Sequence, residues 1–213
     1  MVDRDDLNHY CNQYLSVSKF KDYCPNGLQV EGSQTINKIV SGVSANLDFI
    51  ELAIAEQADA IFVHHGIFWE NESNVIVGSK KKKIELLLKN EINLFAYHLP
   101  LDDHPEVGNN VQLGRALGIK NMKPVDSSLL WQGELNTDLK TFSSLIEKQL
   151  GRPPQLFGRL SGPLNSIAWC TGGAQGFIDE AISLKSDVYL LSLIHISEPT
   201  RPRLISYAVF CLK

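Results

Sequence analysis

Apolar and polar positions along the chain repeat with the periods of helices and strands, and these periods predict its elements. Apolar residues recur at helical spacing in the segments 3–15, 47–57, 80–91, 106–118 and 138–151. Short apolar runs of strand length occupy 38–45, 59–65 and 92–98. Strands that alternate with helices in this way predict an α/β fold with a largely parallel sheet.

A further α/β segment follows a less regular stretch over about 119–138. Residues 166–191 predict a strand, a glycine turn, a helix and a second strand, which together form another βαβ module. We therefore divide the chain into a first α/β half over 1–125, a partial second half over 126–190 and a tail over 191–213. The two halves are expected to be related, with the second one incomplete.

Composition and charge exclude several classes of protein. The chain has 213 residues, 44% of them hydrophobic, and a net charge of −4, so there is no basic excess for nucleic acid. No apolar run has the length of a membrane span, and the polar N-terminus is not a secretory signal. The four cysteines form no CxxC pair. We therefore expect a cytoplasmic protein. The lysine run 80–83 is expected to be the solvated end of a helix.

Histidines end two of the predicted strands. His64 and His65 follow the run 60-AIFV-63, and His98 follows 92-INLFAY-97. Continuous apolar runs of this kind are typical of strands that are buried on both faces of a parallel sheet. Ligands of open α/β sheets bind at the carboxyl ends of the strands, so neighbouring strands would bring the three imidazoles together.

A carboxylate, Asp102, comes shortly after His98 and completes a nitrogen and oxygen donor set. Such a set suits zinc, manganese, iron or nickel. Adjacent strand residues point to opposite sides, so His64 and His65 serve one metal only if the chain bends. Gly66 is expected to supply this bend; otherwise two metals share the cleft.

The alternative for each histidine is an ordinary hydrogen-bonded role in the core or at the surface. We place His9, in the first predicted helix, and His104, in a polar loop, in that class.

Other chemistries have weaker signals. The Gly172–Gly173 turn after Cys170 could face an anion, but a tight connection explains it equally, and Cys170 is expected to be a core residue. Asn110, with its neighbour, is expected to cap a helix or hold a loop.

Longer strings around these residues resemble a known family. They are 25-PNGLQVEG-32, 64-HHGIFW-69, 98-HLPLDDHPEVGNN-110 and 169-WCTGGAQGFID-179. They are similar to the NIF3 family, whose members are called dinuclear-metal hexameric proteins or GTP cyclohydrolase 1 type 2 homologs. The resemblance extends from near the N-terminus to about Leu190.

The resemblance implies a fold, a site and a reaction class. The fold is two α/β halves around a dinuclear metal cleft, assembled as a homohexameric toroid. Carried over by motif, His64, His65 and Asp102 bind two divalent metal ions, and His98 is a further ligand or a catalytic proton carrier. The implied function is a metal-dependent hydrolase acting on a nucleotide- or pterin-related small molecule. The alternative is a non-catalytic, metal-binding adaptor or regulatory ring.

The tail departs from the family pattern. After 187-DVYL-190 the family continues to a later histidine and glutamate that complete both metals, whereas His195 and Glu198 come too early and have no assigned role. One explanation is a shortened member of the family. The other, favoured by the loss of local pattern, is a fragment fused to translated adapter sequence, so that 191–213 is not native. We then expect an inactive chain and a sheet with an unpaired edge.

Overall fold

The structure is a computed structural model that describes residues 1–126, 128–158, 161–194 and 205–211. The chain forms two compact units, Met1–Leu101 and Asp102–Lys213. The division lies before the position near 125 that the sequence pattern predicted. The reason is that residues such as Val111, Leu113 and Ile119 belong to the core of the second unit.

The first unit is built on a four-stranded sheet in the order β2-β6-β5-β4. Strands β4 (Ile39–Ser44), β5 (Ala60–His65) and β6 (Asn93–Ala96) are parallel, and β2 (Gly27–Val30) pairs antiparallel with β6. The short strands β1 (Val2–Asp3) and β3 (Thr35–Ile36) pair separately. The sheet is therefore mixed, because β2 runs antiparallel to its neighbour. The residues of strand β4 are exposed or half-buried.

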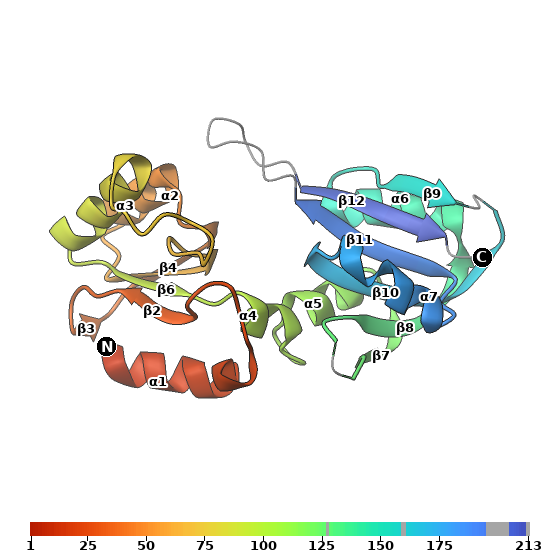
Figure 1. Ribbon diagram of the computed structural model, residues 1–213, viewed down its shortest axis with the longest axis horizontal. Helices are drawn as coiled ribbons and strands as arrows, with labels where there is room; N and C mark the ends of the chain where they lie inside the picture. The colour runs from red at the N-terminus through yellow and green to blue at the C-terminus, as the bar shows by residue number, and fades with distance from the viewer. Residues whose placement is uncertain (127, 159–160, 195–204, 212–213) are drawn as a thin grey trace. The chain divides into compact units, whose positions relative to one another are not determined.

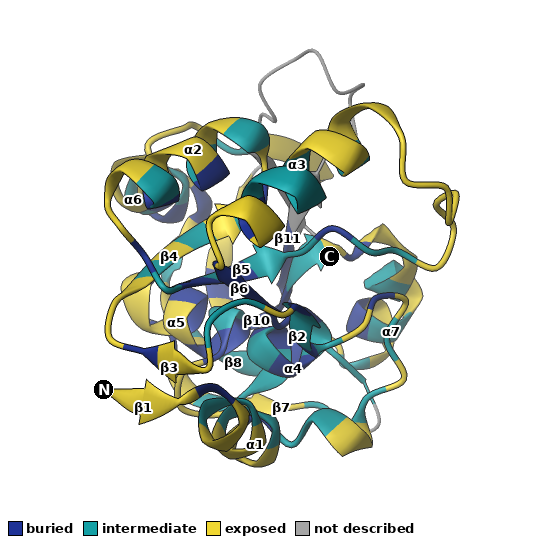
Figure 2. Ribbon diagram, turned by 90° about the vertical axis from the view of Figure 1, so that its left-hand side faces the viewer, coloured by how far each residue is buried: buried dark blue, intermediate teal, exposed yellow. Residues whose placement is uncertain are grey.

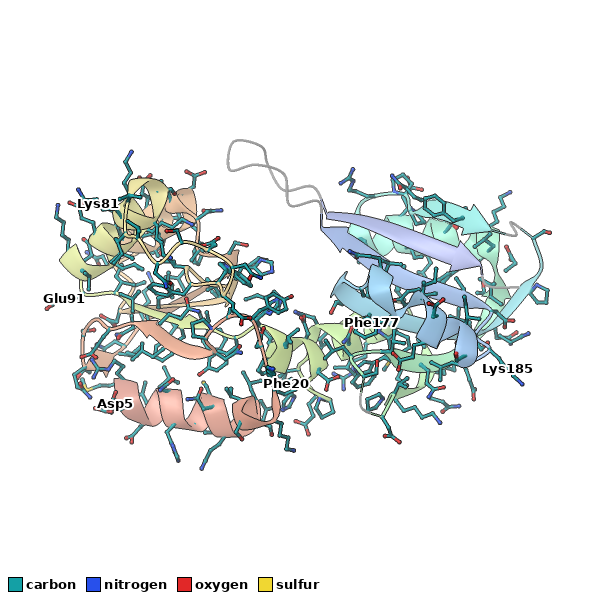
Figure 3. All side chains as sticks on the ribbon, viewed as in Figure 1. Asp5, Phe20, Lys81, Glu91, Phe177 and Lys185 are labelled. Atoms are coloured by element: carbon teal, nitrogen blue, oxygen red, sulfur yellow. The ribbon has the colours of Figure 1, made fainter. Side chains whose placement is uncertain are left out.

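The predicted helices of this unit are confirmed within a few residues. They are α1 (Arg4–Tyr14), α2 (Leu47–Ala55) and α3 (Gly78–Lys89), with η1 (Val17–Lys19) after α1 and α4 (Leu99–Asp103) after β6. Asp3 and Asn46 cap α1 and α2, because their side-chain oxygens accept backbone N–H groups of the first turns. Lys81 points away from α3, as expected for a solvated helix end (Figure 3).

Successive residues of the strands point to opposite faces of the sheet, and they form one core of the first unit on each face. Ile61, Val63 and Leu94 pack with residues of α2 and α3, including Leu87. Their neighbours Ala60, Phe95 and Tyr97 pack with residues of α1 on the opposite face. Figure 1 shows α2 and α3 on one side of the sheet and α1 on the other. Figure 2 shows that the outer surfaces of these helices are exposed. The apolar runs of β5 and β6 follow from this burial on both faces.

One residue of α1 does not face the core as its spacing suggested. Tyr10 was placed on the inner face with Leu7 and Cys11, but its exposed fraction is 62%. Its ring stacks on Tyr14 instead, with centroids 5.9 Å apart. The apolar face of α1 is therefore narrower than the sequence indicated.

The second unit is built on a six-stranded sheet in the order β7-β8-β10-β11-β12-β9. The strands are β7 (Lys120–Pro124), β8 (Trp131–Asp138), β9 (Gln155–Gly158), β10 (Pro163–Gly173), β11 (Val188–Ile194) and β12 (Ile205–Cys211). The predicted parallel pair is confirmed as β10 and β11, whereas β8 pairs antiparallel with β7 and β10. Strands β7 and β8 lie in the stretch predicted to be irregular, because their sequences are largely polar.

Helices cover both faces of this sheet. They are α5 (Asn109–Ala116), α6 (Leu139–Leu150) and α7 (Ile178–Ser183), preceded by η2 (Gln175–Phe177). Trp169 and Phe142 lie in a core with α5 and α6, and Tyr189 lies in a second core on the α7 side. Gly118 and Gly151 follow α5 and α6 with φ of 67° and 74°, which confirms the predicted helix ends.

The expected unpaired edge at β11 is wrong. Strand β12, within the tail, pairs antiparallel with β11 along Val188–Ile194 and parallel with β9. His195 and Glu198 lie outside the described residues. Among the helices of the described segments, none is long and apolar enough to cross a membrane.

Two neighbouring leucines of α3 provide a matched test of this packing. Leu87 is 0% exposed and Leu88 is 55% exposed. Leu87→Ala is expected to lower the free energy of unfolding by about 2–5 kcal/mol, because it leaves a cavity against the sheet. Leu88→Ala is expected to change it by less than about 0.5 kcal/mol. Urea denaturation followed by circular dichroism measures both, and equal losses would contradict the described orientation of α3.

Candidate metal centre

The carboxyl ends of the three parallel strands meet at one edge of the first sheet. Val63 of β5 is in register with Ala96 of β6, and Ser44 of β4 is in register with His65. His98 follows the end of β6 by two residues. The prediction that the two histidine-bearing strands are neighbours is therefore confirmed.

Three imidazoles converge at this edge. The possible ligand atoms of His64, His65 and His98 all lie within 4.8 Å of one another. The ring centroids of His64 and His65 are 4.6 Å apart, and those of His64 and His98 are 4.8 Å apart. His98 is buried, and the other two are half-buried. Adjacent residues of β5 thus reach one cluster.

Hydrogen bonds orient His64 and His65. Nδ1 of His64 lies 2.9 Å from the carbonyl oxygen of Tyr97, which only accepts, so Nδ1 carries the proton. The lone pair of His64 is then on Nε2. Nδ1 of His65 lies 2.9 Å from Oγ of Ser44, at the end of the neighbouring strand. Each ring is held through Nδ1 by an atom of the sheet edge.

Asp22 holds the third imidazole. Its Oδ1 lies 3.0 Å from Nδ1 of His98, and its side chain is 2% exposed. Burial alone would raise the pKa of Asp22, but hydrogen bonds from His98, Asn26 and the Leu99 backbone lower it to about 2. Asp22 is therefore ionised at neutral pH, and Nδ1 of His98 donates to it. The lone pair of His98 is then also on Nε2.

The segment that carries Asp22 also contacts the end of β5. Asn26 accepts the backbone N–H of His98 at 2.7 Å. Gln29 donates to the Pro25 carbonyl at 2.7 Å and accepts the backbone N–H of Ile67 at 2.9 Å. A Cβ on Gly66 would lie 2.1 Å from Oε1 of Gln29. Gly66 has no positive φ, and its contacts show that a residue without a Cβ is needed for this close approach; the chain bends at Ile67, directly after it.

Aromatic rings and a thiol surround the cluster. The rings of Tyr23 and Trp69 meet His98 edge-on, with centroids 5.0 and 5.3 Å from the imidazole. Asp22, Cys24 and His98 form a second group whose possible ligand atoms lie within 4.8 Å of one another. Cys24 is buried and had no predicted role.

Asp102 is the first residue of the second unit. It is 6% exposed, and its Oδ1 accepts from Nδ2 of Asn109 at 2.7 Å and lies 3.4 Å from Oγ1 of Thr171. Asn110 connects the same region, because its Oδ1 accepts the Thr171 backbone N–H at 2.7 Å. This agrees with the loop-holding role expected for Asn110.

Three residues were expected to have structural roles: Cys170, His104 and His9. Cys170 is 2% exposed, and burial followed by the nearby charges of Asp102 and Asp103 raises the pKa of its thiol to about 12. A thiol with a raised pKa is a poor nucleophile at neutral pH. The burial and the pKa of Cys170 therefore support its interpretation as a core residue. His104 accepts the backbone N–H groups of Glu106 and Val107 through Nδ1, which holds its loop. His9 is exposed on α1.

The donor set of the first unit fits a divalent transition metal. Two imidazoles have their proton on Nδ1, which leaves Nε2 with the lone pair that a metal needs. The partners of Nδ1 are a backbone carbonyl and a carboxylate, the usual supports of metal-binding histidines. Three imidazoles are compatible with zinc, iron, manganese or nickel.

A family model for Duf34/NIF3 (NGG1p interacting factor 3) matches residues 2–194. The chain belongs to the NIF3 family. Similar NIF3-family proteins are named GTP cyclohydrolase 1 type 2 homolog. The one from Allochromatium vinosum is 47% identical over 194 residues, which cover 89% of this chain and 76% of the relative. The one from Escherichia coli is 44% identical over 199 residues, which cover 92% and 79% of the two chains.

Solved structures agree with this assignment. The structure titled protein ybgI, unknown function, has a TM-score of 0.84 at 40% identity and covers 92% of this chain and 80% of its own. The crystal structure of TTHA1606 from Thermus thermophilus has a TM-score of 0.80 at 30% identity and covers 98% and 86%. The NIF3 fold predicted from the sequence motifs is thereby confirmed as a mixed α/β architecture.

The contact between Gly66 and Gln29 is open to a double-mutant test. Gly66→Ala is expected to destabilise the protein by about 1–3 kcal/mol, because its Cβ displaces Gln29 from the Ile67 N–H. In a Gln29→Ala background the same change is expected to cost less, with a coupling above about 0.5 kcal/mol. Urea denaturation of the four proteins measures this coupling.

Gly176→Ala is the control, since a Cβ there meets nothing within 4 Å. An additive effect of Gly66→Ala and Gln29→Ala would show that the two side chains do not compete for one space.

Proposed function

We propose that the full-length protein to which this NIF3-family chain corresponds is a metal-dependent hydrolase that acts on a nucleotide- or pterin-related small molecule. The observation that carries the proposal is the convergence of His64, His65 and His98 within 4.8 Å at the carboxyl edge of a parallel sheet. The name of the relatives, GTP cyclohydrolase 1 type 2 homolog, supports the substrate class.

The proposed cofactor is two divalent metal ions, of a kind that imidazole and carboxylate bind: zinc, manganese, iron or nickel. His64, His65 and Asp102 are proposed as ligands, as the family resemblance of their motifs implies. The sequence left His98 open as a ligand or a proton carrier. Its place in the same cluster as His64 and His65 favours the ligand. A homohexameric assembly, expected from the family resemblance, is part of the proposal.

Bound divalent ions would supply Lewis acidity, which polarises a substrate oxygen and makes water acidic enough to attack near neutral pH. The residues of the chain prepare the site for this chemistry. The Tyr97 carbonyl and Asp22 keep the proton on Nδ1 of His64 and His98, so both Nε2 atoms offer lone pairs. Tyr23 and Trp69 pack against His98, which shields one side of the cluster from water.

Metal content and turnover test the proposal together. The purified chain is expected to retain metal after dialysis, and the full-length protein is expected to hydrolyse at least one member of a panel of nucleotides and pterins. His65→Ala is expected to lose most of the metal and the activity, because one of three converging nitrogens is removed. Elemental analysis and product detection by chromatography measure the two effects.

His9→Ala is the matched control, because His9 is an exposed histidine of the same unit and its loss should change neither quantity. A His65→Ala protein with full metal content and full activity would refute the site. Retained metal without turnover of any substrate would instead favour the alternative function, a metal-binding adaptor or regulatory ring.

A further inference from the structure

We propose that Asp22 is a positioning residue of the metal centre, which sets the proton and the ring orientation of His98 through one buried carboxylate. The inference rests on the proposed metal-binding function and deepens it. Asp22 lies outside the histidine motifs, in the loop before β2, and is 76 residues from His98 in sequence.

The two oxygens of Asp22 have separate partners, and all of them are donors. Oδ1 faces Nδ1 of His98 at 3.0 Å. Oδ2 accepts the backbone N–H of Leu99 at 2.9 Å and Nδ2 of Asn26 at 2.9 Å. Asn26 in turn accepts the backbone N–H of His98 at 2.7 Å. One carboxylate therefore holds both the ring of His98 and the backbone that carries it.

This arrangement requires a group that only accepts hydrogen bonds at both oxygens. An ionised carboxylate meets the requirement, whereas an amide of the same shape has one donor end. In Asp22→Asn the amide nitrogen would face either the Leu99 N–H and Asn26 or Nδ1 of His98. The first orientation opposes donor to donor. The second moves the His98 proton to Nε2, and the ring then cannot bind a metal through that atom.

A different role for Asp22 is that of a direct ligand with Cys24, because these two residues and His98 form a second candidate group. The geometry favours positioning, since both oxygens of Asp22 already accept hydrogen bonds from the chain. The two roles differ in what Cys24→Ser does. It lowers metal affinity if Cys24 and Asp22 are ligands, and leaves it unchanged if Asp22 only positions His98.

The test compares Zn²⁺ and Co²⁺ affinity of the full chain with that of Asp22→Asn and Cys24→Ser, by competition with a chelating dye. Asp22→Asn is expected to weaken binding about 10–100-fold, the usual effect of removing such a hydrogen-bond partner from a ligand. The Co²⁺ absorption spectrum is expected to change with it. Cys24→Ser is expected to keep the wild-type affinity.

Asp59→Asn is the matched control for loss of stability. Asp59 is an aspartate of the same unit whose Oδ2 accepts the backbone N–H groups of Asn37 and Lys38 at 2.7 and 2.9 Å. Its substitution removes the same charge and strains similar hydrogen bonds away from the histidines. It is expected to lower the urea midpoint without changing the Co²⁺ spectrum or the affinity.

The tautomer of His98 gives a readout that needs neither activity nor bound metal. In ¹⁵N NMR of the metal-free wild-type chain, with His98 assigned by comparison with His98→Gln, the proton is expected on Nδ1. A proton on Nε2 overturns the inference, as does unchanged affinity in a folded Asp22→Asn protein. A wild-type chain that binds no metal refutes the proposed function instead. The two failures can be distinguished, because the tautomer of His98 is measured without metal.

Discussion

The parallel pairing of β4, β5 and β6 is the constraint on which the first unit depends. It places the ends of the three strands at one edge, with Ser44 beside His65 and Val63 beside Ala96. Because both faces of β5 and β6 are covered, the interiors of these two strands are apolar, and their histidines lie where the strands end. A shift of register would separate the imidazoles while leaving much of the apolar burial intact.

A second layer of order comes from β2 and the loop before it, which act on the strand ends through side chains. Asp22 and Asn26 of the loop hold His98, and Gln29 of β2 holds the backbone after His65. The close contact between Gly66 and Gln29 shows how tightly β2 packs against the chain that follows β5. The histidines are thus positioned by the sheet from one direction and by the loop from another.

Much of this could be predicted from the sequence where apolar periodicity was strong, as for β5, β6 and the long helices. Strands β7 and β8 were missed because their sequences are largely polar. His64 and His98 could be found from strand ends, and the same rule would have found Ser44. Asp22 and Gln29 could not, since their hydrogen bonds span 76 and 38 residues and leave no periodic signal.

The hydrogen bonds on the Nδ1 atoms have a consequence for the thermodynamics of metal uptake. The entropy lost when the rings of His64 and His98 are ordered is part of the free energy of folding, because Tyr97 and Asp22 order them. A small zinc finger recovers that cost only when the ion binds, so it unfolds when the ion is removed. Here the histidines are ordered without an ion, so under the proposed function ions would be exchanged in a chain that stays folded.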